Sequence, residues 1–267
     1  MNIRPKHTHL LLILLLCFLL ASCGKPAGPI PATEPSAAPT LQVTVPVQTE
    51  LPVTEVPTHP SHSDLYIPGL SVEDVILYFE EVCLDAEIIN SGNPRVLQKW
   101  VAPISYTLHG DYTDEDLQVL ASFAEWLNSL DGFPGIQEAG SDETANLRIH
   151  FCSLEGMVAI MGEQFCGMDG AVTFWYMDDE IYDATICYRT DLDQYLRNSV
   201  ILEELYNGLG PIQDSTLRPD SVIAAEFSQP QALTDIDKLI LQLLYHPQMQ
   251  CGMDTEACES VIRQLYY

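Results

Sequence analysis

A proline-rich segment near the N-terminus limits what this chain of 267 residues can fold into. Residues 24–62 contain nine of the 18 prolines, with Ala, Thr, Ser and Val between them and no apolar period. A segment of this composition forms no core and favours extended, polyproline-like backbone. The sequence therefore predicts a disordered Pro/Thr/Ala-rich tether over residues 23–63. A single folded domain is expected over residues 64–267, a length of about 200 residues that is sufficient for a good core.

The residues before the tether have the pattern of an export signal. Two basic residues precede an apolar run over residues 10–20, which is too short to span a bilayer comfortably. The sequence Leu-Ala-Ser then leads into Cys23, and this arrangement resembles a bacterial lipobox. It predicts a lipoprotein signal peptide over residues 1–22 and lipidation of Cys23. The mature chain is then extracytoplasmic and anchored to the bacterial cell membrane through Cys23. The alternative is an ordinary signal peptide that happens to contain a cysteine.

The charge balance makes one class of partner improbable. The chain has 38 Asp and Glu residues against 11 Lys and Arg residues, a formal net charge of −27. Such a charge repels a phosphate backbone, and no basic stripe offsets it. Nucleic acid is therefore not expected as a partner.

Six cysteines remain in the expected domain. Export favours disulfides, and an even number of cysteines agrees with full pairing, although fifteen pairings are possible. Close spacing favours Cys152–Cys166 and Cys251–Cys258, which leaves Cys83–Cys187. A structural zinc-thiolate site is the rival interpretation, and it is disfavoured because the chain has no CxxC pair.

Apolar periodicity predicts an α/β (α+β) domain with a mixed sheet. Two segments, 104–109 and 147–151, alternate like strands, and two further strands, 172–177 and 181–188, flank Asp-Asp-Glu as a hairpin. Helical spacing and capping residues predict five helices. These helices start near Ser71, Thr113, Leu192, Thr234 and Glu256. The third runs to about Leu209 and stops at Gly210-Pro211.

The segment ILEELYNGLG, residues 201–210, resembles the H-E-x-x-H-x-x-G helix of metzincin metallopeptidases. When Gly210 is placed on the glycine of that motif, Glu204 falls on the catalytic glutamate. Glu203 and Asn207 then stand where the two zinc-binding histidines belong. The resemblance implies a zincin-like fold, in which a mixed sheet supports one long active-site helix and is followed by C-terminal helices.

Two further segments extend the resemblance. LTDIDKLILQLLY, residues 233–245, resembles the helix that closes the C-terminal part of zincins. LEELYNGLG, Asp214 soon after it, and LYHPQMQCGM at residues 244–253 together resemble the bacterial domain-of-unknown-function family 2927, many of whose members look like lipoproteins. The resemblance covers about residues 97–253.

The zinc-binding histidines of the motif are missing. Zinc peptidases need two neutral imidazoles on one helix face, together with a glutamate that takes a proton from the metal-bound water. Glu203, Asn207 and Asp214 offer only oxygen atoms, which suit magnesium or calcium better than zinc, and they do not form a recognisable calcium loop. The sequence therefore predicts no zinc site and no cofactor.

Each candidate residue also has a structural interpretation. Glu203 and Glu204 are compatible with two solvated helix acids, Asn207 with a residue near the helix end, and Asp214 with a loop cap. His109 and His246 are expected at the surface or at helix ends rather than as ligands. The run Phe174-Trp175-Tyr176 offers rings that could stack on sugars, but alternate strand residues usually fill the core.

Three functions compete. The favoured hypothesis is a non-catalytic, zincin-like binding domain whose cleft, formed by Glu203, Asn207, Gly210 and Asp214, binds a peptide, a wall polymer or an envelope protein. The alternative is a peptidase-like hydrolase, with or without a metal, that uses Glu204 as its general base. A structural envelope protein without a cleft function is the third.

Overall fold

The structure is a computed structural model that describes residues 9–11, 66–84, 96–226 and 229–266. The predicted tether, Cys23 and most of the predicted signal peptide lie outside the described residues. Within these ranges, no helix is both long and apolar enough to cross a membrane.

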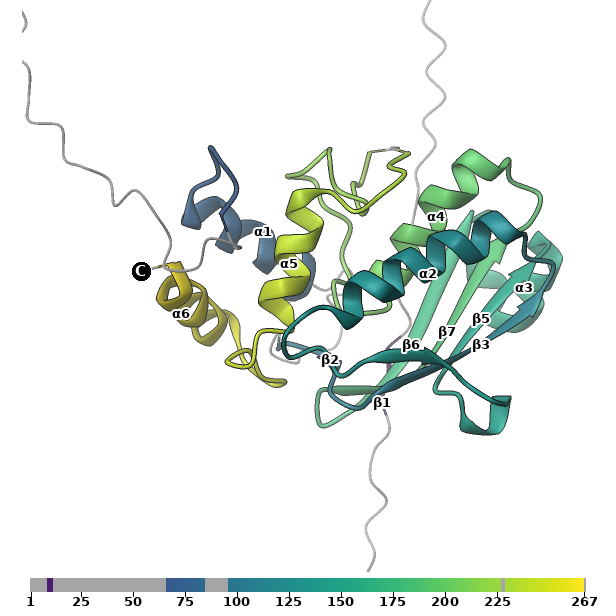
Figure 1. Cartoon of the computed structure of the whole chain (residues 1–267), viewed down its shortest axis with the longest axis horizontal. Coiled ribbons are helices and arrows are strands. Elements are labelled where there is room, and N and C mark those ends of the chain that lie inside the picture. Colours follow the sequence, from purple (N-terminus) through teal and green to yellow (C-terminus); the bar gives the residue numbers. More distant parts are fainter. Residues whose placement is uncertain (1–8, 12–65, 85–95, 227–228, 267) are drawn as a thin grey trace, which may run out of the picture. The chain divides into compact units, whose positions relative to one another are not determined.

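One mixed sheet forms the framework (Figure 1). Its strands follow one another in the order β1-β6-β7-β5-β3-β4, and β2 pairs with the start of β7. The pairs that involve β2, β3, β4 and β5 are parallel, whereas β6 is antiparallel to both β1 and β7. The strands are β1 His9–Leu11, β2 Lys99–Trp100, β3 Ile104–Gly110, β4 Ile136–Glu138, β5 Leu147–Cys152, β6 Gly170–Met177 and β7 Glu180–Arg189.

Six α-helices accompany the sheet in the described ranges: α1 Val72–Leu84, α2 Asp114–Asn128, α3 Leu154–Met161, α4 Gln194–Asn207, α5 Asp235–Leu244 and α6 Thr255–Tyr266. Helices α2 and α4 lie side by side over one face of the sheet (Figure 1). Ile186 of β7 points toward that face, because a Cβ on Gly208 would lie 3.4 Å from its side chain. Cys187 therefore faces the other way, and there it packs with Met157 of α3.

Local capping explains where several helices begin. Thr113 accepts a hydrogen bond from the backbone N–H of Asp116, whose carboxylate accepts one from the backbone N–H of Thr113 in return. Thr234 and Asp237 form the same capping box at α5, and Ser71 and Asp74 bond reciprocally before α1. These contacts satisfy N–H groups that have no partner inside the helix, so the predicted starts of α1, α2 and α5 are confirmed.

The hairpin between β6 and β7 turns through Asp178 and Asp179. Both residues have a positive φ, of 54° and 64°. A two-residue turn of this kind matches the right-handed twist of the two strands. The predicted hairpin is therefore confirmed, with a turn of two acidic residues rather than three.

Helix α4 ends at Asn207, two residues before the predicted end at Leu209 and shortly before the predicted stop at Gly210. Gly208 is its C-cap, and Gly210 has a φ of 133°. A Cβ at Gly210 would lie 2.7 Å from the backbone oxygen of Gln98, so only glycine fits this close approach.

The expected α/β class with a mixed sheet is confirmed. Four short elements, α3, β1, β2 and β4, had no counterpart in the sequence prediction. The first helix was expected to span about twenty residues, and its described part is α1, after which residues 85–95 lie outside the description.

Candidate functional site

Helix α4 carries the residues that the sequence singles out. Asp193 caps its start by accepting a hydrogen bond from the backbone N–H of Leu196. Near its end, Glu204 and Asn207 are buried, with 2% and 1% of their surfaces exposed, whereas Glu203 is half-buried. The interpretation of Glu203 and Glu204 as two solvated helix acids is therefore wrong for Glu204.

Glu204 points toward the start of β6. A Cβ on Gly170 would lie 2.7 Å from Cγ of Glu204 and 3.0 Å from its Oε1. The carboxyl group is thus pressed against the backbone of the strand next to it. A side chain at position 170 would collide with Glu204 and with Val200 one turn earlier.

Several acidic side chains influence one another at this place. Burial, followed by the negative charges of Asp214 and Asp169, raises the pKa of Glu203 to about 8. Burial raises the pKa of Glu204 well above its ordinary value, and Glu203 and Asp214 add to the shift. Both carboxyl groups therefore favour the protonated form at neutral pH.

The structure thus brings together Glu203, Glu204 and Asp214, which the sequence predicts as one cleft. Asn207 follows one turn after Glu203 on the same helix. Neither amide atom of Asn207, nor Oε2 of Glu204, has a hydrogen-bond partner among the described residues. Gly210 belongs to the helix end, where it permits contact with the backbone of Gln98.

These donors do not fit the zinc that a zincin-like fold implies. No group of three or more His, Cys, Asp or Glu side chains in the described ranges is arranged to hold a metal ion. Two of the histidines, His109 on β3 and His150 on β5, stack on each other with ring centroids 4.6 Å apart. Protonated carboxyl groups and an amide are poor ligands for zinc.

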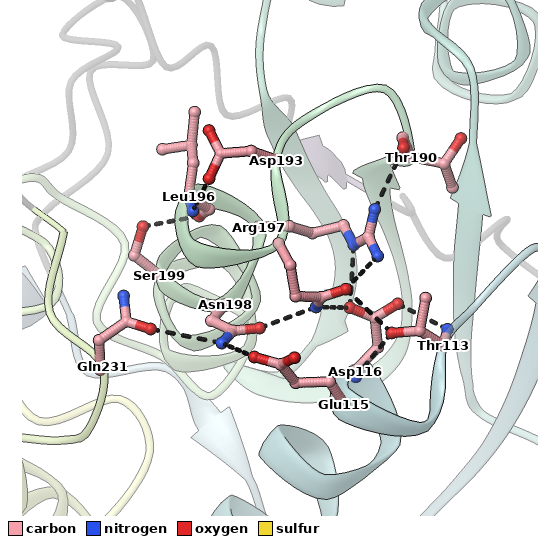
Figure 2. A network of polar contacts seen from close by, with 11 residues as sticks. Thr113, Glu115, Asp116, Thr190, Asp193, Leu196, Arg197, Asn198, Ser199 and Gln231 are labelled. Atoms are coloured by element: carbon pink, nitrogen blue, oxygen red, sulfur yellow. Dashed lines mark hydrogen bonds and ion pairs between the residues drawn. The ribbon is translucent and has the colours of Figure 1, made fainter.

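A second polar cluster joins α2 to α4 (Figure 2). Nε of Arg197 lies 2.9 Å from Oδ1 of Asp116, and both side chains are buried. Gln194 bonds to both of these residues and to Asn198. This cluster was not predicted, because Asp116 and Arg197 are far apart in the sequence and no local pattern joins them.

The cysteines do not form the predicted disulfide bonds in the structure. All six are free thiols in the structure. The thiols of Cys152 and Cys187 hydrogen-bond to each other across β5 and β7, and Cys258 lies close enough to Cys83 to raise its pKa, although burial of Cys83 is the larger cause. None of the predicted pairs is joined in the structure, and Cys187 lies beside Cys152 rather than beside Cys83. Cys152 and Cys166 are close in sequence, but the neighbour of Cys152 in the sheet is Cys187.

A search of curated proteins found no match. The family model of a protein of unknown function, DUF2927, matches residues 73–264. That range contains all of the helix α4 site and extends beyond the segments in which the sequence shows a resemblance. The chain belongs to the DUF2927 family.

Proposed function

We propose that this chain is an extracytoplasmic lipoprotein, anchored to the bacterial cell membrane through Cys23, with a zincin-like domain that binds an extended peptide segment of a partner without cleaving it. The lipobox-like sequence before Cys23 supports the anchor. The tether would hold the domain away from the membrane, because a proline-rich chain extends by about 3.1 Å per residue. We prefer a peptide to a wall polymer as the ligand, because the outer edge of β6 can pair with an extended peptide backbone.

The pairing of β1 with β6 is the observation that carries the proposal. Residues His9–Leu11 form β1 and lie antiparallel to Phe174–Tyr176 of β6. These three residues belong to the predicted signal peptide. If the signal peptide is removed during export, the outer edge of β6 keeps N–H and C=O groups without a strand partner. Such an edge accepts an extended peptide by strand addition.

The state of Glu204 supports a binding role over the hydrolase alternative. A general base must be ionised at the working pH, but burial and the neighbouring acids hold the pKa of Glu204 well above its ordinary value. Its carboxyl group is also pressed against Gly170 of β6 rather than open to a substrate. A carboxyl group that is protonated and packed against Gly170 does not activate water, so we favour binding at the edge strand without cleavage.

Export also predicts disulfides, and the structure favours two pairs. Cys152 and Cys187 are hydrogen-bonded thiols on adjacent strands, and Cys83 and Cys258 are buried on the packed helices α1 and α6. We expect these two bridges in the exported protein, in place of the pairs favoured by spacing.

The peptide-binding proposal is tested with a strand of known register. A synthetic peptide with the sequence of residues 7–14, flanked by lysines for solubility, is added to the processed protein recovered from an expressing bacterium. We expect hydrogen exchange at the backbone amides of residues 174–176 to slow when the peptide is added. The same peptide with N-methylated backbone amides is the matched control, since it keeps the side chains but cannot donate to the edge.

Equal binding of the two peptides would contradict strand addition, because side chains alone would then carry the affinity. Slow exchange at residues 174–176 before any peptide is added would mean that the edge is already covered.

A separate experiment tests the membrane anchor. Cys23→Ser is expected to release the protein from the membrane fraction, and its retention there would contradict lipid anchoring.

A further inference from the structure

A cavity of about 470 Å³ lies on the side of α4 away from Glu204. One stripe of α2 forms a wall, Leu202 of α4 lies opposite it, and Leu233 closes it from the segment before α5. The apolar part of the α2 wall consists of Val119, Phe123 and Trp126. The size and the apolar lining are typical of sites for small organic molecules or single side chains of a partner.

The cavity is separate from the site formed by Glu203 and Glu204. An α-helix turns by about 100° per residue, so Leu202 and Glu204 point in nearly opposite directions from α4. Leu202 lines the cavity, whereas Glu204 faces Gly170 of β6. Neither the zincin resemblance nor the edge of β6 assigns a role to this cavity.

Polar groups at one end of the cavity are already engaged with one another (Figure 2). The buried amide nitrogen of Asn198 donates to Oε1 of Glu115 at 2.8 Å and to Oε1 of Gln231 at 3.3 Å. Its Oδ1 accepts from Gln194 at 2.9 Å. These hydrogen bonds hold the side chain of Asn198 in place at this end of the cavity.

Lys238 lines the same cavity from the first turns of α5, and it is half-buried. Among the described residues, each arginine forms an ion pair with an aspartate or glutamate, and the ammonium of Lys99 donates to two backbone carbonyls. Lys238 has no such partner in the described ranges. This is unusual in a chain with 38 acidic and 11 basic residues. A cation beside an apolar wall and without an acid of its own is complementary to an anionic group with an apolar body.

We propose that the cavity binds a carboxylate attached to an apolar or aromatic group, with Lys238 pairing with the carboxylate and Phe123 and Trp126 contacting the apolar group. Glu115 repels a second negative charge, so the ligand carries one carboxylate and turns it toward Lys238. A small organic acid and the C-terminal residue of a partner peptide share this chemistry. The site is independent of the edge of β6.

The test is isothermal titration of the full chain with matched probes. The first pair is 4-phenylbutyrate and its uncharged amide, and the second is a tripeptide ending in phenylalanine with a free or an amidated C-terminus. We expect at least one carboxylate to bind about tenfold more tightly than its amide, since a charge-assisted pair in a half-buried site is worth on the order of 1.4 kcal/mol. The pair that binds identifies the source of the carboxylate.

Four variants make the outcome specific. Lys238→Gln should abolish the difference between acid and amide, and Lys238→Arg should keep it. Trp126→Ala should weaken both members of the pair, whereas Tyr182→Ala, which removes an exposed ring that does not line the cavity, should change neither. Thermal melting confirms that each variant is folded. Equal affinity of acid and amide, unchanged binding in Lys238→Gln, or no binding of any probe at millimolar concentration would overturn the proposal.

Discussion

The side chains of Glu204 and Asn207 occupy positions on α4 where a polar group carries a free-energy cost. Both are buried, and Oε2 of Glu204 and the amide of Asn207 lack hydrogen-bond partners in the described part of the chain. Leaving such an atom without a partner costs about 1–3 kcal/mol. A cost of this kind is commonly retained where a site needs a particular chemical group rather than where packing alone decides.

Glu203 should make the stability of the fold depend on pH. Its pKa is about 8 in the folded chain, against an ordinary value of 4.5. Between these values the folded chain holds the proton more tightly than the unfolded chain, so the free energy of unfolding falls as pH rises through this window. Glu203→Gln should remove this part of the dependence. In this variant, the decrease in the free energy of unfolding between pH 5 and pH 8, measured by urea unfolding, should be smaller by on the order of 2 kcal/mol.

The matched control is Glu125→Gln, which changes an exposed glutamate of α2. In Glu125→Gln, the free energy of unfolding should depend on pH as it does in the unmodified protein. If Glu203→Gln and Glu125→Gln had the same slope, Glu203 would be an ordinary solvated acid and the acidic site would lose its main electrostatic feature.

At the scale of elements, α2 and α4 are joined by a buried ion pair. Burial raises the pKa of Asp116, but hydrogen bonds from Arg197 and from the backbone of Thr113 together lower it below its ordinary value. The carboxylate is therefore charged and depends on Arg197. Arg197→Met should lower the free energy of unfolding by about 3–5 kcal/mol, because a buried charge is left without its partner.

A double variant separates the two causes of that loss. Asp116→Asn combined with Arg197→Met removes both charges and should recover part of the stability, as measured by denaturant unfolding. Arg218→Gln breaks an ion pair with the exposed Asp220 and should cost only about 0–1 kcal/mol. A loss from Arg197→Met as small as that from Arg218→Gln would mean that the pair does not hold α2 against α4.

The helices and strands also show which sequence patterns were sufficient to predict an element. The capping boxes at Thr113 and Thr234 act within one helical turn, so the starts of α2 and α5 were predicted from neighbouring residues. Alternation likewise predicted β3 and β5. The short elements β2 and β4 were missed, because strands of two and three residues contain too few positions for a period and depend on a neighbouring strand.

At the scale of the whole molecule, the cysteines test whether the chain is exported. If Cys152–Cys187 and Cys83–Cys258 form, each pair gives up two protons and two electrons to a disulfide oxidant outside the cytoplasm. Mapping of unreduced peptides from the exported protein should find both bridges. Reduction should then lower the melting temperature, since each native bridge is worth about 2–4 kcal/mol.

The pair of variants Cys152→Ser and Cys166→Ser gives the matched comparison. Cys152 contacts Cys187, whereas Cys166 is exposed. Only Cys152→Ser should lower the melting temperature of the oxidised protein. Recovery of a Cys152–Cys166 peptide would restore the pairing favoured by spacing, and complete alkylation without reduction would show that the thiols remain free.

The sequence by itself determined the features that depend on near neighbours: the helix caps, the alternation of the strands, the hairpin turn and the stop after α4 at Gly210. It also placed Glu203, Glu204 and Asp214 together through a resemblance. Only the tertiary structure decided how these groups behave, because the pKa of Glu204 depends on burial against Gly170 and on charges brought from other segments. The partner of Arg197, the neighbour of Cys187 and the cavity beside Lys238 likewise join residues that are far apart in the chain, and no local pattern encodes such contacts.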